Sequence, residues 1–347
     1  MAKTQTRVRP LLVRPGARYT CAGDGLCCTD IHGLGPLTKK ELVQIRKIDP
    51  DGAGWDDDFE ERMLTNAPDG GCHFLLPDLR CGVHATFGPE AKPEGCRRFP
   101  LGLVATPQGG RITTEHRCPC RTMGDRPILT QEAALPSLLN SHGNPRPDRR
   151  VKKVKLAKKT KVNFDEWRAI EARLLGALAE GLDPDEVLSA EAFPRLKGST
   201  WIEEFDNILE EAPDGTAFGF AAVWFAETGR GLLNEDHVVR LPQRPWTSAF
   251  ERAESRPTVT KRSATEVFAD WIADEIWSLK WSIRAFDIAR SDLTTRLAIG
   301  RDICERLIAE GIDEARAAAE AVMVVELLGE SDFWTDIADK IRVDTPE

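Results

Sequence analysis

The chain has 347 residues, of which 41% are hydrophobic and 30% charged, and 56 acidic against 47 basic residues give a net charge of −9. This composition is typical of an ordinary globular protein long enough for two domains with their own cores. The negative net charge gives no general reason to expect nucleic acid as a partner, and no fixed-period repeat is visible.

The first twenty residues carry five basic side chains but no secretory signal, because their longest apolar run is Leu11-Leu12-Val13. No stretch of the chain approaches the roughly 18–20 apolar residues of a membrane span, so no membrane partner is expected. We therefore expect a cytoplasmic protein in a reducing compartment, where structural disulfides are rare.

Local signals predict three elements in the first part of the chain. A capping box at Thr38-Lys39-Lys40-Glu41 opens a short helix that Asp49-Pro50 closes. Residues 72–76 and 80–86 flank Pro77-Asp78-Leu79, which predicts a hairpin. Residues 101–106 and 111–116 flank Pro107-Gln108-Gly109-Gly110, which predicts a second one.

The middle of the chain is basic: residues 146–161 contain nine Lys or Arg against a single acid, Asp148. The pattern favours a solvated linker, or an edge strand whose Val151, Val154 and Leu156 face inward while its lysines face water. A patch for nucleic acid or an acidic partner is the alternative. The absence of interleaved aromatic residues speaks against base stacking.

The last part of the chain has helical periodicity. Asn163 is placed to cap a helix that runs to Leu178, and Thr265 to open a longer one that runs through Ile283. The stretch Phe218–Ala226 predicts a buried helix. The tryptophans along these helices are interpreted as core rather than as the lining of a ligand groove, and Cys304 as a small buried hydrophobe.

These elements predict an α+β fold. A small, irregular, cysteine-rich metal-binding module with short hairpins is expected at 1–125 and a basic linker or edge strand at 126–162. A mostly α-helical domain is expected at 163–347.

The strongest signal is the concentration of thiols. Eight of the nine cysteines lie within the first 120 residues, namely Cys21, Cys27, Cys28, Cys72, Cys81, Cys96, Cys118 and Cys120. In a reducing compartment such a cluster indicates metal ligands, whereas a disulfide framework would require export. There is no Cys-x-x-Cys pair, so zinc ribbons, thioredoxin motifs and the bacterial ferredoxin spacing do not match.

Eight thiolates are twice what one tetrahedral zinc or one four-iron cluster needs. The spacing leaves three arrangements open: two closed sites, one closed site with reactive spare thiols, or one open site that binds a substrate. The adjacent Cys27 and Cys28 suit two neighbouring sites or a tight turn around one, and Gly23 and Gly25 would permit such a turn. Pro119 would fix the relative direction of Cys118 and Cys120.

Arginines stand beside several of these thiols, at Arg80, Arg97, Arg98, Arg117 and Arg121. Compensation of the negative charge of a metal–thiolate site is the expected role for most of them, and reception of an anionic substrate or cofactor is the alternative. His73 and His116 are spare candidate ligands, for which a hydrogen-bonded structural role is expected.

These blocks resemble the YkgJ-like cysteine-cluster family, described as a zinc- or iron-chelating domain with eight cysteines. The resemblance covers roughly residues 20–125. Cys21 to Cys28 is similar to the family's opening Cys-x-x-Cys-x-x-Cys-Cys, with Asp24 where the family often has its second Cys. The blocks Cys72-His73-Phe74-Leu75 with Cys81-Gly82-Val83-His84, Pro93-Glu94-Gly95-Cys96-Arg97-Arg98-Phe99-Pro100 and Cys118-Pro119 resemble the later motifs in order.

The resemblance implies a metal ion or cluster, either zinc or a [4Fe–4S] cluster, held by the eight cysteines. Asp24 is either an oxygen ligand or a solvated turn residue. Cys27, Cys72, Cys81 and Cys96 lie in the best-matching blocks and are expected to be the least replaceable ligands.

Flagellin lysine N-methylases carry a similar module with an attached C-terminal region. One alternative function is therefore an iron–sulfur-dependent lysine N-methyltransferase that uses S-adenosylmethionine on a protein substrate. A metal-sensing or metal-delivery module is a third.

Overall fold

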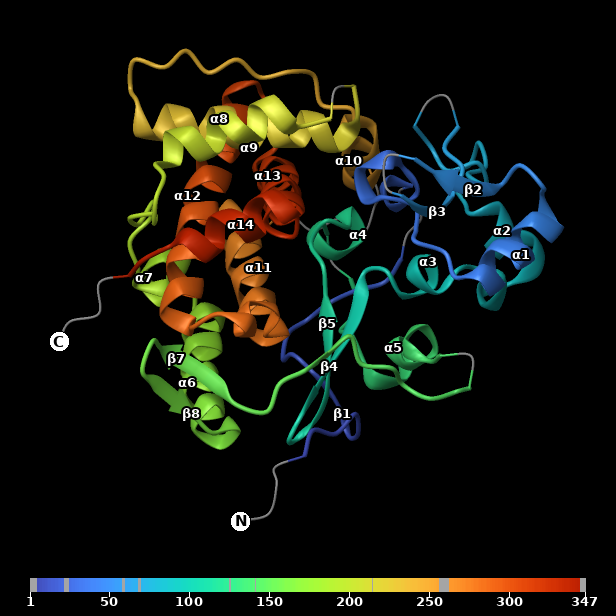
Figure 1. Ribbon diagram of the computed structural model, residues 1–347, viewed down its shortest axis with the longest axis horizontal. Coiled ribbons are helices and arrows are strands. Elements are labelled where there is room, and N and C mark those ends of the chain that lie inside the picture. The colour runs from blue at the N-terminus through green and yellow to red at the C-terminus, as the bar shows by residue number, and fades with distance from the viewer. Residues whose placement is uncertain are drawn as a thin grey trace.

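The structure is a computed structural model, and it describes residues 5–21, 25–57, 60–67, 70–124, 126–140, 142–213, 215–255 and 262–343. Many helices and three small sheets make up these ranges, so the predicted α+β class is confirmed (Figure 1). Within the same ranges, every helix is too short or too polar to cross a bilayer.

The first lobe lies at the right of Figure 1 and contains short elements around a small core. Its helices and strands are α1 (Lys39–Ile48), β2 (Ala53–Asp56), β3 (Glu61–Leu64), α2 (Gly82–Phe87) and α3 (Glu94–Arg98), and β2 pairs antiparallel with β3. The predicted capping box of α1 is confirmed, since the Thr38 side chain accepts from the backbone of Glu41 while the Glu41 side chain accepts from the backbone of Thr38. We call residues 25–100 the cysteine lobe.

A four-stranded sheet follows in the middle of the molecule, with strand order β1-β5-β4-β6. Its strands are β1 (Leu11–Val13), β4 (Leu101–Thr106), β5 (Gly109–Thr114) and β6 (Arg149–Arg150). The predicted second hairpin is confirmed as β4 and β5, which pair from Leu101 opposite Thr114 to Thr106 opposite Gly109. Two short helices flank the sheet, α4 (Pro119–Thr122) and α5 (Gln131–Leu138).

The basic segment at 146–161 forms edge structure, as predicted. Arg149–Arg150 is the edge strand β6, and β7 (Val154–Ala157) pairs with β8 (Thr160–Val162) in a separate hairpin. Val151 and Val154 are buried against the helices, while Lys152 and Lys153 between them are exposed.

The helices of the last part surround the long, almost wholly buried helix α13 (Glu314–Gly329). The others are α6 (Phe164–Ala179), α7 (Pro184–Leu188), α8 (Trp201–Glu211), α9 (Ala217–Leu233), α10 (Thr247–Glu254), α11 (Ala264–Ser278), α12 (Phe286–Ala309) and α14 (Asp332–Lys340). Trp167, Trp224, Trp246, Trp271 and Trp334 are among the largest fully buried side chains, so the interpretation of these tryptophans as core is confirmed. Cys304 is buried in the same core.

Two predicted elements differ from the structure. The hairpin predicted at 72–76 and 80–86 does not form. The two segments share only the bridge between Leu75 and Cys81, after which the chain turns into α2, because Gly82, His84 and Ala85 have little preference for a strand. The helix predicted through Ile283 starts after Ser263 and ends at Ser278, since Leu279 adopts a left-handed φ of 55° and a short 3₁₀ turn follows.

Candidate metal centre

Five of the eight clustered cysteines line a single cavity in the cysteine lobe. Cys27, Cys28, Cys72, Cys81 and Cys96 come from four segments of the chain, and together with apolar side chains they enclose about 50 Å³. A cavity needs only roughly 10–15 Å³ to hold one water molecule, so this space can accept a metal ion.

A tight turn brings the first two thiols to the cavity. Gly25 has a φ of 83°, a conformation that glycine adopts without strain, and its carbonyl accepts a hydrogen bond from the backbone of Cys28. Cys27 and Cys28 therefore lie in a 3₁₀ turn with their sulfurs 4.0 Å apart. A tight turn is thus present at this pair. Gly23 and Asp24 lie outside the described residues.

Backbone hydrogen bonds fix the other three thiols around this turn. The Cys72 N–H donates to the Cys28 carbonyl at 2.7 Å, which places the two segments side by side. Cys81 is the N-cap residue of α2, and Cys96 lies within α3. The hydrophobic residues under the site come from α1, β2 and β3, with Ile45 and Leu64 at their centre.

A lysine that the sequence reasoning missed faces the same cavity. Lys92 follows a 3₁₀ turn just before the block that contains Cys96, and its side chain lines the cavity with the five cysteines. Its ammonium group makes no hydrogen bond or ion pair with the described part of the chain. A half-buried cation without a carboxylate partner, beside several thiols, is placed to balance negative charge on sulfur.

The environment of three of these thiols, Cys27, Cys72 and Cys96, favours their protonated form. Burial raises the pKa of Cys96 to about 12, and neighbouring Cys72 and Cys81 add to this shift while Lys92 opposes it. The pKa of Cys72 is raised, mainly by burial. The pKa of Cys27 is raised by its contact with Cys28 and by burial. Metal binding here would have to displace protons, which couples metal affinity to pH.

The remaining three thiols all lie within electrostatic reach of one tyrosine, Tyr19. Burial raises the pKa of Tyr19 far above its usual value, and the next contributions come from Cys118, Cys21 and Cys120, which all lie within electrostatic reach of its hydroxyl group. Cys118 is the N-cap residue of α4, and Pro119 opens that helix. Cys27 is within the same reach of Tyr19 and of Cys21, so it connects the two groups of thiols.

The cysteine sulfurs lie near one another but are not as close together as the ligands of one bound metal ion. No two of the nine cysteines, all of which are described, are joined by a disulfide. Within the described ranges, no three thiol sulfurs lie within 4.8 Å of one another. A tetrahedral zinc with Zn–S bonds of about 2.3 Å would draw its sulfurs to roughly 3.8 Å apart. A mononuclear site would therefore need the cavity walls to move inward.

Four of the five arginines beside the thiols pair with carboxylates rather than with sulfur. Arg80 pairs with Asp78, Arg98 with Asp148, Arg117 with Glu115, and Arg121 with Asp270 and Asp274. Arg97 donates to the backbone carbonyl of Leu139. The fold explains these partners. Each guanidinium binds a carboxylate or carbonyl group that either lies far away in the sequence or belongs to the same turn.

The two candidate histidine ligands are hydrogen-bonded structural residues, as expected. His73 Nε2 lies 2.9 Å from Asp49 at the end of α1, and the fully buried His116 Nε2 lies 2.9 Å from Asp274. Because of burial and the nearby Arg121, the pKa of His116 is lowered to about 4, so the ring is neutral near pH 7.

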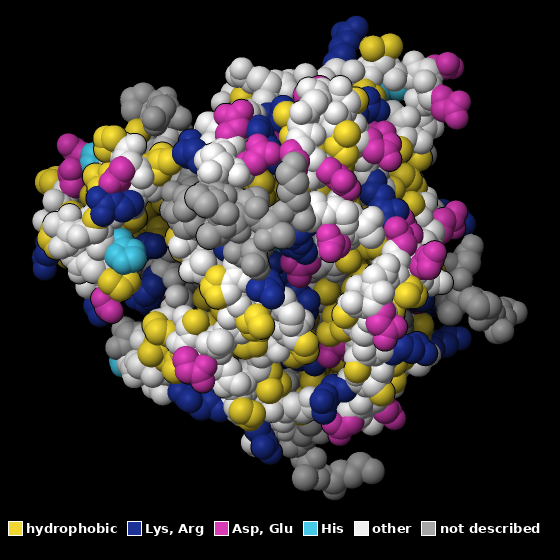
Figure 2. Space-filling view, turned by 180° about the vertical axis from the view of Figure 1, so that it is seen from behind, with side chains coloured by type: hydrophobic (Ala, Val, Ile, Leu, Met, Phe, Trp, Pro, Cys, Tyr) yellow, Lys and Arg dark blue, Asp and Glu magenta, His cyan; other side chains and the backbone are white. Residues whose placement is uncertain are grey.

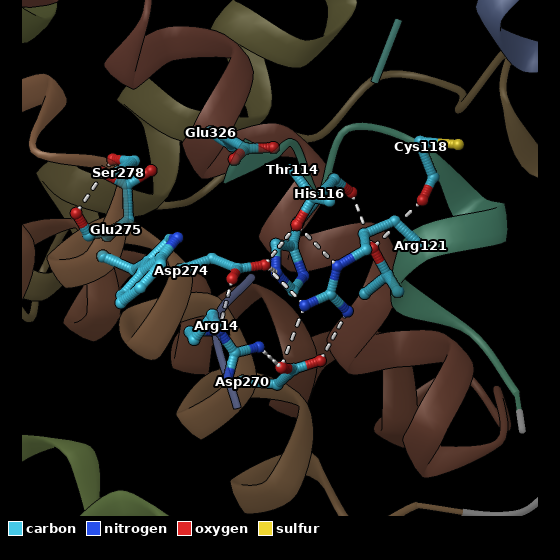
Figure 3. A network of polar contacts seen from close by, with 12 residues as sticks. Arg14, Thr114, His116, Cys118, Arg121, Asp270, Asp274, Glu275, Ser278 and Glu326 are labelled. Carbon is cyan, nitrogen blue, oxygen red and sulfur yellow. Dashed lines mark hydrogen bonds and ion pairs between the residues drawn. The ribbon is translucent and has the colours of Figure 1, made fainter. Parts of the chain in front are cut away.

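His116 belongs to a buried polar network that joins the sheet to α11 (Figure 3). Arg14 and Arg121 both bind Asp270 and Asp274, and Thr114 donates to Asp274 at 2.6 Å. His116, Asp270 and Asp274 lie close enough together to hold a metal ion. The two guanidinium groups already neutralise both carboxylates, which identifies the network as a structural junction.

Comparison with known proteins found no matching family model, no matching curated protein and no matching solved structure. The resemblance to the YkgJ-like family therefore rests on the sequence blocks alone. What the geometry adds is that the blocks around Cys27, Cys72, Cys81 and Cys96 meet at one cavity.

Proposed function

We propose that the protein binds metal, as iron–sulfur or zinc, through the cysteines of its N-terminal part. The observation that carries the proposal is the convergence of Cys27, Cys28, Cys72, Cys81 and Cys96 on one small cavity with Lys92. To bring these thiols together, several segments of the chain must lose conformational entropy, which opposes folding. Metal–thiolate bonds offset that loss.

The residues present fit such a centre. Cys72, Cys81 and Cys96, with Cys27 or Cys28, would supply four thiolates, and four thiolates on one Zn²⁺ carry a net charge near −2 by counting ligands. Lys92 would offset part of that charge. Cys21, Cys118, Cys120 and the remaining cysteine of the Cys27–Cys28 pair would supply a second set around Tyr19.

The spacing of the sulfurs favours an iron–sulfur cluster over a single zinc ion. In a cluster each thiolate binds a different iron, so the sulfurs stay further apart than around one tetrahedral ion. Absence of any three sulfurs within 4.8 Å of one another, among the described residues, agrees with the wider arrangement.

The test is anaerobic purification of the full chain followed by iron, zinc and acid-labile sulfide analysis. We expect iron and sulfide in equal amounts, with visible absorption that disappears on oxidation. Stoichiometric zinc without sulfide would select the zinc alternative. A native, never-chelated protein without metal, in which all eight thiols react with a thiol reagent, would contradict the proposal.

The lysine N-methyltransferase alternative requires a substrate cleft beside the thiols. A cleft borders the sheet, but its lining contains Arg14, Arg18, Arg111, Arg121, Arg168 and Arg262. Guanidinium groups repel a lysine ammonium group. The charge of this cleft therefore supports a different class of ligand.

A further inference from the structure

A large cleft lies between the first strand, α6 and α11, outside the thiol centre. It encloses about 1410 Å³, which exceeds the roughly 300–1,000 Å³ of ordinary small-molecule sites. Its walls are the segment Leu12–Gly16, one face of α6 and the N-terminal two-thirds of α11. Figure 2 shows Lys and Arg side chains gathered about a depression near the middle of the face opposite that of Figure 1.

The charge of the cleft is opposite to that of the protein. Six arginines line it against three carboxylates, Glu171, Glu266 and Asp270. Asp274 stands directly behind the lining as a fourth carboxylate, paired with Arg14 and Arg121. Six positive and four negative charges leave an excess of two positive charges, in a chain whose net charge is −9. Such local reversal concentrates anions in a cleft.

The carboxylates are already engaged. Asp270 is shared by Arg14, Arg121 and, at 3.4 Å, Arg262. Glu266 accepts from the backbone and side chain of Ser263 in the capping box of α11. These contacts hold the arginines in place without cancelling all of their charge.

The excess is clearest at the end of the cleft near Arg111. Glu171 on α6 holds the buried Arg111 in a bidentate pair at 2.5 and 2.7 Å, and the Arg111 Nε–H has no acceptor. Arg168 stands three residues before Glu171, on the same face of α6. Its guanidinium makes no hydrogen bond or ion pair with the described chain. Two guanidinium groups thus border one carboxylate. Arg111 is buried between the rings of Phe164 and Trp277, so the accessible donors are those of the exposed Arg168.

Beyond Glu171, the wall that α6 contributes is apolar. Leu175 and Leu178 follow on the same face of α6, and Trp277 closes the Arg111 end with its ring beneath that guanidinium. A ligand that matches this lining carries two negative charges at one end and an apolar or aromatic body. Phosphate bound to an organic group has this form, and guanidinium groups bind its oxygens in bidentate fashion.

We propose that this cleft binds a phosphate ester of nucleotide size, with the phosphate at Arg168, beside the buried Arg111–Glu171 pair, and the organic body along the apolar face of α6. The site is separate from the thiol centre, and the proposal stands whether or not the protein binds metal.

The test is calorimetric titration of the full-length protein, as purified, with ADP, pyrophosphate, citrate and uncharged adenosine. We expect ADP and pyrophosphate to bind, ADP more tightly, and Arg168→Gln to weaken both about tenfold or more. Arg168→Lys should lose less affinity than Arg168→Gln, because lysine keeps the positive charge although it cannot bind two phosphate oxygens in bidentate fashion. Arg173→Gln is the matched control, since Arg173 is exposed on the same helix and does not line the cleft.

Thermal unfolding and metal content should be unchanged in all three variants, because Arg168 and Arg173 are exposed. Tighter binding of citrate than of both phosphate compounds would overturn the assignment to phosphate. Failure of ADP and pyrophosphate to bind at millimolar concentrations, or equal loss in Arg168→Gln and Arg173→Gln, would overturn the site.

Discussion

The cysteine lobe and the helical part of this protein are built on cores of very different size. The lobe buries seven apolar residues at its centre, and the largest of them are leucine and isoleucine. The core of the helical part contains five fully buried tryptophans and most of α12 and α13. Since burial of apolar surface is the main favourable term in folding, the difference teaches that only the lobe should depend on a ligand for its stability.

Metal removal should have the largest effect, and it should destabilise the cysteine lobe but not the helical part. A chelator strong enough to empty the site should abolish hydrogen-exchange protection in the cysteine lobe, because its small core cannot hold four cysteine-bearing segments together. The helices α11 to α13 should keep their protection. Equal loss in both regions would show one cooperative unit, and no loss would show that the metal is not structural.

Replacement of single cysteines should sharpen the same division. Cys96→Ser, like serine at Cys27, Cys72 or Cys81, should lower metal content by half or more and destabilise the lobe, since it opens a closed site. Cys304→Ser is the matched control, because Cys304 is a buried cysteine that lies in the helical core. Metal analysis of both proteins is the measurement. Loss of metal from the Cys304 variant would show that the division is wrong.

Buried ion pairs join the sheet to the helices. The sheet should therefore unfold together with the helical part and not with the cysteine lobe. Arg111 on β5 and Glu171 on α6 are both almost fully buried. Glu171→Gln leaves Arg111 charged without a charged partner and should cost about 3–5 kcal/mol of unfolding free energy. Denaturant unfolding checks this. A loss below about 1 kcal/mol, as for an exposed pair, would mean that water screens the junction.

Acid should weaken the junction before it affects the apolar cores. Burial alone would raise the carboxyl pKa values, but Arg121 and Arg14 lower those of Asp270 and Asp274 well below the usual range, and Lys280 and Arg117 lower that of Glu115 to about 2. Because the folded-state pKa values are depressed, this stability is present above about pH 4.5 and is lost as the pH falls toward 2.

Unfolding free energy measured across that range should therefore fall in the wild type. Asp274→Asn should be less stable at neutral pH and should show a shallower fall below pH 4.5. If unfolding free energy falls with pH as steeply in this variant as in the wild type, Asp274 does not contribute to the loss of stability in acid.

Lys92 should give the smallest effect. Lys92→Met keeps the length of the side chain but removes the charge beside the thiols, so metal affinity should fall about tenfold near neutral pH. Competition with a chromogenic chelator measures this. Lys39→Met is a suitable control, since Lys39 is exposed and does not line the cavity. Equal affinities in the two variants would exclude an electrostatic role for Lys92.

Local signals in the sequence predicted local structure well. The capping residues Thr38 and Asn163 open the helices α1 and α6 as expected, and the turn Pro107-Gln108 joins β4 to β5. These predictions succeeded because a cap or a tight turn is decided by hydrogen bonds between residues two to four positions apart. The strand expected at 80–86 failed because a single bridge was outweighed by helix formation after Cys81.

The sequence by itself determined the α+β class, the apolar faces of the helices and the set of thiols that candidate metal ligands come from. Only the tertiary structure decided which thiols meet. Five of them share a cavity with Lys92, while Cys21, Cys118 and Cys120 lie within electrostatic reach of Tyr19. It also decided that Arg121 pairs with carboxylates on α11 rather than with its neighbour in sequence, Cys120. The packing of segments that are distant in the sequence decides which side chains become partners. The spacing of residues along one segment carries no information about this packing.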